Sequence, residues 1–410
     1  MKVLLVVKSK AIETLGVMYL AAVVKKAGHE CKITDIADAP LVSTVWYPDL
    51  IGYSIMTGDR GKFKALNEDI KKSIYFTSIA GGADVTFFPK GYEWADHVVR
   101  GEGENWLAGF LGSDIRYADI NSIPWPDRAD FPGMKIRDFI ASRGCANSCS
   151  YCYNSAWNKM FPDIAKVRTR DVKDVIAELS SIQDAEFFYA QDSCFAPDIK
   201  WMRAFSAQYK RKIYVPYHVH LRPNQVTEER VLLLHDSNCV SVKIALETAS
   251  DRLRKLINRG TQKNEDAYLA ARILKKWGVA LILQNMIGIP TATIEDDLHT
   301  LEVNIKCRPA YAWVSIFQPY PATPLAKYCE KEGLYTGNYS EIGDTFFDKS
   351  VLNFDDVHKE QIACLQRIFA FCVEMQVMPT VEDLTWERLP KFIHNAMRKV
   401  GDRRMFPGIL

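Results

Sequence analysis

The sequence contains no long hydrophobic run. Of its 410 residues, 48% are hydrophobic and 25% are charged, which is the balance of an ordinary globular protein. No apolar stretch approaches the ~18 residues that a membrane-spanning helix requires. The apolar run at positions 1–7 is soon followed by Lys8 and Lys10 and is too short for a secretory signal, so it predicts a buried strand. We therefore expect a cytoplasmic protein without a membrane span.

An excess of either charge is also absent. Lys and Arg number 52 against 50 Asp and Glu, which leaves a net charge of +2. Proteins that bind nucleic acids or anionic membranes usually carry a clearly basic surface. We therefore expect no nucleic-acid partner, and the composition leaves both a small molecule and a peptide open as the substrate.

Residues 1–113 alternate short apolar runs with helical patterns. These patterns predict strands at 3–7, 31–36, 49–54, 75–79 and 97–99, and helices at 15–26 and 61–72. Strands and helices that alternate at this pace favour a parallel sheet covered by helices on both faces. The sequence therefore predicts an α/β fold that begins with a doubly wound, Rossmann-like domain at residues 1–116.

Residues 117–135 interrupt this alternation with Pro-rich stretches, which predict a linker. Strand candidates then centre near residues 139, 188, 215, 242, 282 and 314, each followed by a helical pattern. Six such units favour a partial (β/α)6 barrel at residues 136–332, with its chemistry at the carboxyl ends of the strands. Residues 333–410 predict a mostly helical segment, with helices at 356–375 and 386–399.

Disulfides are not expected among the ten cysteines, because the cytoplasm is reducing. Cys145, Cys149 and Cys152 instead have the spacing C-x3-C-x2-C directly after the first barrel strand. A structural zinc site usually takes four ligands in two separated pairs. No second C-x2-C pair exists, and the next cysteine is Cys194. The spacing therefore disfavours zinc, which stays the main alternative.

Three thiolates on one loop favour an iron–sulfur cluster, which otherwise takes four cysteines. A four-iron cluster held by three cysteines leaves one iron open to the amino and carboxylate groups of a small molecule, and S-adenosylmethionine (SAM) offers both groups. We therefore predict a [4Fe–4S] cluster on Cys145, Cys149 and Cys152. Thiols that take no part in metal binding are the remaining alternative.

These residues resemble the cluster motif CxxxCxΦC of the radical SAM superfamily, with Tyr151 at the aromatic position. The resemblance implies reductive cleavage of SAM to a 5′-deoxyadenosyl radical, with an electron donor such as flavodoxin or ferredoxin. It continues with one motif on each later strand. It implies that the following residues contact SAM: Tyr151, Gln191, Asp192, Arg222, Glu247, Gln284, Ile289 and Pro290.

The resemblance implies that Gln191 and Asp192 contact the methionine amino group of SAM, with Asp192 the better candidate. It further implies that Arg222 pairs with the carboxylate and that Glu247 contacts the ribose or the methionine part. A last motif at residues 317–325 departs from the family pattern, because Ala322 stands where the family has Gly. Solvated strand ends and ordinary turns would explain any one of these residues alone. Their order along the chain, one motif on each strand, favours the site.

Three further side chains near strand ends are candidate catalytic residues. Cys194 follows Asp192 by two positions and is a candidate hydrogen-donating thiol, against the alternative of a small buried hydrophobe. His218 and His220 alternate on one strand, so their side chains share a face. This placement makes them candidates for substrate binding or proton transfer.

The start of the chain resembles the cobalamin-binding domain that is fused to many radical SAM enzymes. The matching segments are 15–22, 26–30, 52–57, 81–89 and 98–104. The resemblance implies cobalamin contacts from the following residues: Leu15, Gly16, Ser54, Thr57, Gly81, Gly82, Gly101, Glu102 and Gly103. Turns and a helix N-terminus would also explain them.

One departure concerns the metal of cobalamin. The domain lacks the motif D-x-H-x-x-G, and Asp84 stands where the family commonly has His. We therefore predict that cobalamin binds without a histidine ligand on cobalt. A domain that has kept the fold and lost the ligand is the alternative.

The pairing of this domain with a single-cluster barrel predicts cobalamin-dependent methylation of an unactivated carbon. A radical rearrangement or ring-forming enzyme and a non-catalytic metal-binding scaffold are the alternatives. The methylthiotransferase branch carries three N-terminal cysteines, whereas residues 1–113 contain only Cys31, so that branch is disfavoured. We expect the substrate between the barrel mouth and the N-terminal domain, closed by residues 333–410 and their aromatic residues Tyr335, Tyr339, Phe346 and Phe347.

Overall fold

The computed structural model describes residues 1–405 except 165, 197 and 344. The chain divides into two compact units. The first unit comprises Met1–Gly144, Pro162–Asp192 and Tyr339–Asp344, and the second comprises Cys145–Phe161, Ser193–Asn338 and Thr345–Leu410. These units are defined by which residues pack together, and they do not test the domain boundaries suggested by the sequence, which stay predictions.

A five-stranded parallel sheet begins the first unit, in the strand order β2-β1-β3-β4-β5. Its strands are β1 (Lys2–Val7), β2 (Glu30–Asp35), β3 (Leu50–Ser54), β4 (Thr77–Gly81) and β5 (His97–Val98). Its helices are α1 (Leu15–Lys26), α2 (Ala39–Trp46), α3 (Arg60–Ile70), α4 (Ala83–Phe87) and α5 (Glu104–Phe110). The predicted doubly wound fold is confirmed.

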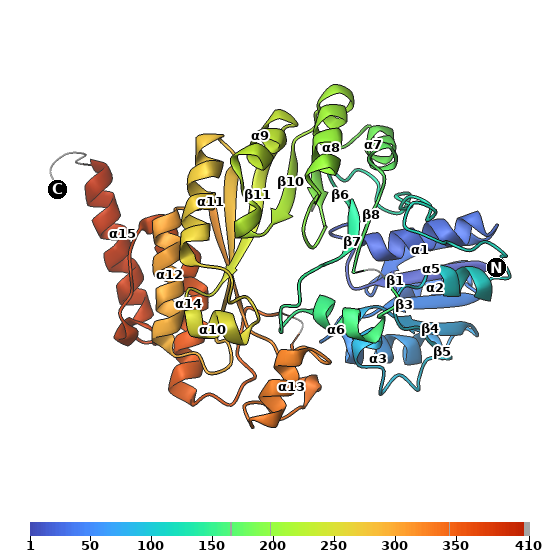
Figure 1. The fold of residues 1–410 in the computed structure, drawn as a ribbon. Coiled ribbons are helices and arrows are strands. Elements are labelled where there is room, and N and C mark those ends of the chain that lie inside the picture. Colours follow the sequence, from blue (N-terminus) through green and yellow to red (C-terminus); the bar gives the residue numbers. More distant parts are fainter. Residues whose placement is uncertain (165, 197, 344, 406–410) are drawn as a thin grey trace. The chain divides into compact units, whose positions relative to one another are not determined.

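Helices cover both faces of this sheet, which explains why every residue from Val3 to Val7 is buried. The odd-numbered side chains of β1, such as Leu5, pack with α1 and α5 in one hydrophobic core. The even-numbered Leu4 and Val6 pack with α2 and α3 in another. Figure 1 shows α1 and α3 on opposite sides of the strands.

Two further strand pairs belong to the first unit. β6 (Ile136–Phe139) pairs in parallel with β9 (Phe187–Ala190), and α7 (Val172–Ser181) precedes β9. β7 (Ser142–Gly144) pairs antiparallel with β8 (Val167–Thr169), an element that the sequence patterns do not predict. The cysteine motif begins at the residue after β7, so this pair joins the two ends of the segment that carries it.

The second unit contains a parallel sheet in the order β13-β12-β11-β10. Its strands are β10 (Tyr217–Leu221), β11 (Cys239–Glu247), β12 (Ala280–Ile287) and β13 (Tyr311–Ile316). Its helices are α6 (Tyr153–Met160), α8 (Ile199–Lys212), α9 (Glu228–Asp236), α10 (Asp251–Leu256), α11 (Asn264–Lys276), α12 (Ile294–Cys307), α13 (Pro324–Lys331), α14 (Asp356–Met375) and α15 (Leu389–Met405). Together with β6 and β9, these strands make up the six of the partial barrel, which confirms the predicted fold class.

The two faces of β10–β13 differ in burial. Val219, Val242, Leu283 and Val314 are buried, and Val314 packs in the core that contains α12 and α14. The alternate side chains are half-buried and mostly polar, among them His220, Lys243 and Gln284. The sheet of β10–β13 therefore has one apolar, buried face and one polar, half-buried face. In barrel folds ligands bind at the carboxyl ends of such strands.

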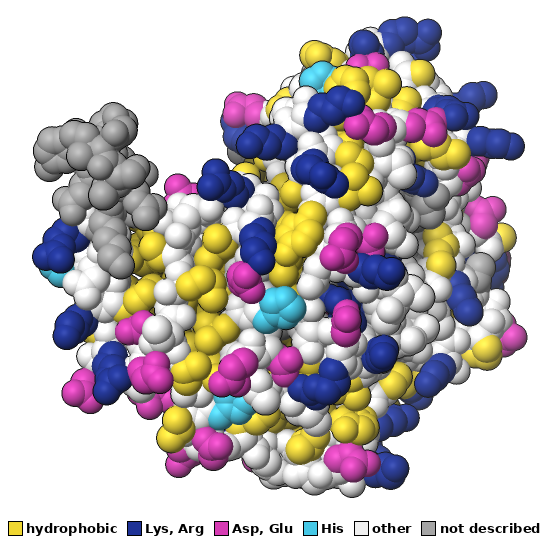
Figure 2. Space-filling model, turned by 60° about the vertical axis from the view of Figure 1, so that its left-hand side comes forward, with side chains coloured by type: hydrophobic (Ala, Val, Ile, Leu, Met, Phe, Trp, Pro, Cys, Tyr) yellow, Lys and Arg dark blue, Asp and Glu magenta, His cyan; other side chains and the backbone are white. Residues whose placement is uncertain are grey.

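Two surface properties complete the fold. No helix in the described part of the chain is long and apolar enough to cross a membrane. Figure 2 shows basic and acidic side chains interspersed on the face that it presents, in keeping with the net charge of +2.

Candidate active site

The three cysteines of the motif lie on one loop of the second unit, between the end of β7 and the start of α6. All three side chains are half-buried. The Nδ2 of Asn147 lies 3.3 Å from the Sγ of Cys145, and the Nδ2 of Asn154 lies 3.7 Å from the Sγ of Cys152, so amide groups donate toward two of the sulfurs. Hydrogen bonds to sulfur are one way in which proteins tune a cluster.

The donor set of this loop suits iron and sulfur. Burial raises the pKa of the Cys152 thiol, and the neighbouring Cys149 and Cys145 raise it further. In the described part of the chain no three His, Cys, Asp or Glu side chains are grouped closely enough to hold a metal ion. Three soft donors on a short loop fit an iron–sulfur cluster.

Two arginines place positive charge beside the cysteine loop. Burial raises the pKa of the Cys149 thiol, and the charges of Arg259 and Arg222 offset part of that rise. Arg222 follows β10, and its Nε is buried without a hydrogen-bond partner among the described residues. Buried polar groups are nearly always satisfied, so an anionic ligand such as the SAM carboxylate fits this position.

A buried hydrogen-bond network fixes Tyr151. Its hydroxyl donates to the carboxylate of Glu247 at 2.7 Å and accepts from Arg259 at 3.0 Å. Arg259 also pairs with Glu247 at 2.9 Å, and both side chains are below 5% exposed. Glu247 closes β11 with a φ of 66°, in the left-handed region. The sequence analysis missed Arg259, because nothing in its spacing marks it as the partner of Glu247.

The predicted SAM residues on β12 and directly after it also belong to the second unit. Gln284 is half-buried on β12, and Ile289 and Pro290 are buried after it. The backbone N–H of Gly288 donates to the carboxylate of Asp297 at 3.0 Å, and burial raises the pKa of that carboxyl to about 8. Asp297 is a second residue that the sequence analysis missed.

The three candidate catalytic residues all belong to the second unit. Cys194 lies beside the carboxyl end of β10, and His218 and His220 lie on β10 itself. The Sγ of Cys194 donates to the Oε1 of Gln225 at 2.6 Å, and burial raises the pKa of the thiol. The rings of His218 and His220 are 5.2 Å apart, which confirms that they share a face. Their catalytic roles stay predictions.

The first unit holds the remaining predicted SAM residues. The carboxylate of Asp192 accepts from the backbone N–H of Ala141 at 3.0 Å and from the Oγ of Ser142 at 2.5 Å. Burial raises the pKa of Asp192 to about 6. Gln191 donates to Asp138 at 2.9 Å. Both side chains have protein partners here, and their contacts with SAM stay predictions.

The predicted cobalamin residues all lie at the carboxyl edge of the five-stranded sheet. The strand order reverses between β1 and β3, and doubly wound sheets bind ligands beside such a reversal. Leu15 and Gly16 follow β1, whereas Ser54 ends β3 and pairs in register with Gly81 at the end of β4. This edge, with its small residues, fits a large flat ligand.

Gly82 and Thr57 also have structural roles at that edge. Gly82 has a φ of 100°, and a Cβ there would stand 2.6 Å from the backbone N of Ile55. The hydroxyl of Thr57 donates to Asp84 at 3.0 Å, and Asp84 also pairs with Arg60 at 2.7 Å. Close packing therefore requires Gly82 whether or not a ligand binds.

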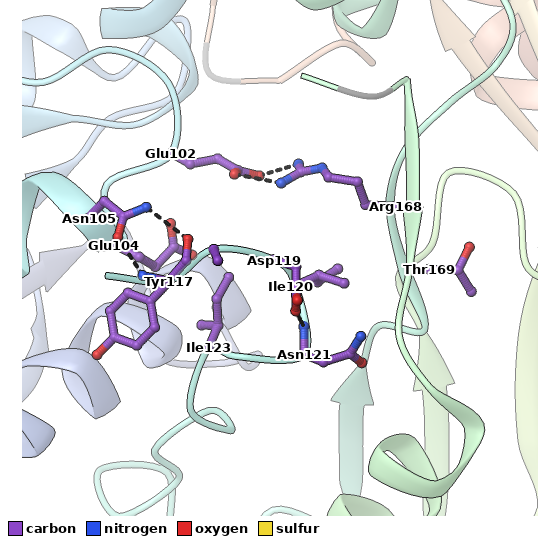
Figure 3. Close-up of a pocket in the computed structure, with 11 residues that line it drawn as sticks. Glu102, Glu104, Asn105, Tyr117, Asp119, Ile120, Asn121, Ile123, Arg168 and Thr169 are labelled. Carbon is purple, nitrogen blue, oxygen red and sulfur yellow. Dashed lines mark hydrogen bonds and ion pairs between the residues drawn. The ribbon is translucent and has the colours of Figure 1, made fainter. Parts of the chain in front are cut away.

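Glu102 and Glu104 form ion pairs in the first unit. Glu102 accepts from both terminal nitrogens of Arg168, at 2.8 and 2.5 Å, and lies 3.2 Å from Arg143, which also pairs with Glu104 at 2.7 Å. Burial would raise the pKa of Glu102, but these arginines outweigh it and lower the pKa. Figure 3 shows Glu102 and Arg168 facing each other. Both line a cavity of about 360 Å³. Gly101 and Gly103 flank Glu102, and Gly103 precedes α5.

The two histidines of the N-terminal domain lie at different levels of its sheet: His29 is at the amino edge, and His97 pairs in register with Ile79 in the middle of β4. His29 comes directly before β2, and its Nε2 is 3.1 Å from the carbonyl of Leu111. His97 is the first residue of β5, and its ring packs on Trp106 and Phe110. His29 is therefore at the far end of the strands from the carboxyl edge, and the ring of His97 is engaged by α5.

Comparison with known families agrees with this geometry. The model of the radical SAM superfamily matches residues 139–303, and the model of the B12 binding domain matches residues 1–111. The chain therefore carries a radical SAM domain and a B12-binding domain. It is a radical SAM enzyme with a B12-binding domain, and its cofactors are a [4Fe–4S] cluster, SAM and cobalamin.

Individual relatives are distant. An uncharacterized methyltransferase of Pyrococcus horikoshii is 26% identical over 371 residues, which cover 77% of this chain and 78% of the relative. The anaerobic magnesium-protoporphyrin IX monomethyl ester cyclase of Cereibacter sphaeroides is 24% identical over 298 residues, 60% of this chain and 47% of the relative. The radical SAM methyltransferase TsrM from Kitasatospora setae has a similar fold, with a TM-score of 0.66, 16% identity and coverage of 81% of this chain and 76% of that chain.

Proposed function

We propose that this enzyme is a cobalamin-dependent radical SAM methyltransferase that acts on an unactivated carbon. The observation that carries the proposal is the union of a B12-binding domain with a radical SAM domain in one chain whose only closely spaced cysteines are Cys145, Cys149 and Cys152. The relative from Pyrococcus horikoshii is named a methyltransferase, as is TsrM, which supports the same reaction class.

When bound, the cluster supplies the electron that cleaves SAM, and cobalamin supplies the methyl group. The chain's own residues hold and orient these groups. Cys145, Cys149 and Cys152 would hold three irons. Arg222 would donate its buried Nε to the SAM carboxylate. Tyr151 is held by Glu247 and Arg259, which keeps the cysteine loop in one conformation.

We further propose that cobalamin binds without a histidine from its own domain. His29 lies at the amino edge of the sheet and the ring of His97 packs on α5, whereas the loops after β1, β3 and β4 lie at the carboxyl edge. An outside reductant of the flavodoxin or ferredoxin class would supply the electron.

Ring formation is the second candidate reaction. The relative from Cereibacter sphaeroides is named a cyclase, and it matches 60% of this chain. A cyclase of this kind would use the same radical start and would not transfer a methyl group.

The test uses full-length protein, supplied with hydroxocobalamin and reconstituted anaerobically with iron and sulfide. We expect about four irons and one cobalt per chain, and 5′-deoxyadenosine after addition of dithionite and SAM. The electron paramagnetic resonance spectrum of the reduced cobalt should show no nitrogen ligand below the corrin. The triple variant with Cys145, Cys149 and Cys152 changed to Ala should lose iron and 5′-deoxyadenosine but keep cobalt.

The matched control is Cys307→Ala, which removes a buried thiol far along the sequence from the motif and should keep both metals. Protein that makes 5′-deoxyadenosine but takes up no cobalt would overturn the methylation proposal and favour a cobalamin-free reaction. A nitrogen signal on cobalt that persists in the His29→Ala and His97→Ala variants would show a different ligand, and its loss in either variant would overturn the proposal that no histidine of this domain binds cobalt.

A further inference from the structure

The half-buried face of the second unit's sheet carries side chains that no cofactor role uses. Successive residues of a strand point to opposite faces, so His218 and His220 on β10 share a face. The register of β10 and β11 pairs His218 with Ser241 and His220 with Lys243. Three basic side chains therefore stand together on one face of two neighbouring strands.

Hydrogen-bond and cation–π contacts hold these groups in place. The Nδ1 of His218 and the Oγ of Ser241 are 2.7 Å apart. The Nζ of Lys243 lies 5.1 Å from the centroid of the Trp313 ring, within the range of a cation–π contact. Burial lowers the pKa of His218 to about 3, and the positive charges of His220 and Lys243 lower it further. His218 is therefore a neutral, fixed partner, and Lys243 is the cationic side chain of this face.

Aromatic rings continue the face beyond Lys243. The ring of Trp313 is 5.5 Å from that of Phe347 and 6.4 Å from that of Phe346, and the two phenylalanine rings are 4.5 Å apart. The carbonyl of Phe346 accepts a hydrogen bond from the N–H of Ile316 at 2.8 Å, which ties this segment to the end of β13. All three rings are half-buried, so part of their apolar surface stays open.

We name the set His218, His220, Lys243, Trp313, Phe346 and Phe347 the basic–aromatic face. We propose that this face binds the substrate of the enzyme, and that the substrate is an organic acid with a flat unsaturated ring. Its carboxylate would accept from Lys243 and His220, and its ring would pack on Trp313 and Phe347. Hydrogen bonds between charged partners are about twice as strong as neutral ones, so a carboxylate is favoured over an amide of the same shape.

The assignment of a substrate class rests on the proposed function, but its test does not need turnover. Cofactor-loaded full-length protein is equilibrated by dialysis with three probes: 2-naphthoate, its neutral amide 2-naphthamide, and the saturated decahydro-2-naphthoate. We expect 2-naphthoate to bind about tenfold more tightly than either of the others, because only it offers both a charge and a flat ring.

Two variants separate the two halves of the face. Lys243→Met should weaken 2-naphthoate about tenfold and leave 2-naphthamide unchanged, whereas Trp313→Leu should weaken both. Lys276→Met is the matched control, because Lys276 pairs with Glu228 on the exposed side of the second unit. If Lys243→Met loses iron or cobalt, His220→Gln takes its place, with the same expected selectivity.

Absence of 2-naphthoate binding, equal binding of the acid and the amide, or an unchanged affinity in Lys243→Met would each overturn the inference. Failure of the proposed function gives a different pattern. If the protein binds 2-naphthoate as expected but takes up no cobalt, the proposed substrate site stands and the proposed methylation is overturned.

Discussion

Glu102 offers a direct test of how the cysteine segment is anchored. Its carboxylate takes two hydrogen bonds from Arg168 on β8 and lies 3.2 Å from Arg143 on β7. In the described part of the chain Arg168 has no other acceptor for its terminal nitrogens. Glu102→Gln removes the charge and keeps the shape, so β7 and β8 lose a shared anion.

The magnitude follows from the exposure of the three side chains. Loss of one partner from a buried ion pair costs about 3–5 kcal/mol, and loss of an exposed pair costs about 0–1 kcal/mol. Glu102, Arg143 and Arg168 are 27%, 16% and 22% exposed, which places them between these limits. Because glutamine keeps one acceptor, we expect about 2 kcal/mol, which corresponds to about a 30-fold increase in local opening.

Hydrogen exchange read by mass spectrometry measures that opening directly. Peptides that cover Ser142–Gly144 and Val167–Thr169 should exchange about 30-fold faster in Glu102→Gln. Glu186→Gln is the control, because Glu186 and its partner Lys135 are 69% and 60% exposed. Unchanged exchange in these strands, or the same change in the control, would refute the anchoring role. Since Gly144 directly precedes Cys145, we also expect faster loss of iron to a chelator.

Three other substitutions test the site. Gly144→Ala should prevent iron loading, because its φ is 91° and a Cβ would stand 2.1 Å from the carbonyl O of Lys166. The control Gly112→Ala has a φ of 76° and open space around the new Cβ, so it should cost only about 1 kcal/mol of stability. Equal iron contents in the two variants would contradict this role of Gly144. Arg259→Met should lower the free energy of unfolding by about 3–5 kcal/mol, because Glu247 stays buried without its partner. The control Arg203→Met removes an exposed pair with Glu229 and should lower it by less than about 1 kcal/mol. Similar losses for both variants in denaturant titrations would count against a buried pair. The difference in unfolding free energy between Asp297→Asn and the wild type should grow by about 3 kcal/mol in favour of the variant from pH 6 to pH 9. The reason is that the folded pKa of Asp297, near 8, lies above its unfolded value, so the wild type loses stability as the pH rises toward 8. A difference that does not vary with pH would argue that the carboxyl has an ordinary pKa.

The sequence predicts elements whose signals are local. The helix expected at 15–26 is α1, because its pattern ends at Gly28, which has a φ of 84°. The helix expected at 356–375 is α14, whose first turn is capped by the side chain of Asp355. The strand expected near residue 215 begins only at Tyr217, because Pro216 has no N–H for the ladder.

Elements held by distant partners escape that kind of analysis. β7 and β8 have three residues each, too few for an alternating pattern, and their arginines find Glu104 and Glu102 at separations of 39 and 66 residues. The small residues and acids of positions 101–104 are equally consistent with a cofactor loop and with an anchor. Only the fold shows that the two acids have arginine partners.

The aromatic residues after 333 illustrate the same limit. Sequence proximity groups Tyr339 with Phe346 and Phe347, yet the ring of Tyr339 contacts Phe88 of the first unit, whereas Phe346 and Phe347 contact Trp313 of the second. Tyr335 is buried in the second unit. Clustering along the chain does not determine which core a ring joins, and the lid role of this segment stays a prediction.

Ala322 shows why a departure from a family motif need not alter a site. Its φ of 64° lies in the left-handed region, where glycine is favoured and alanine costs about 1 kcal/mol. Two contacts hold the backbone there despite that cost. The next residue, Thr323, caps α13 with its hydroxyl, and the N–H of Leu325 donates to the carbonyl of Ser150 within the cysteine loop at 2.9 Å. The replaced glycine therefore changes the cost of the loop and leaves its attachment to the cluster motif in place.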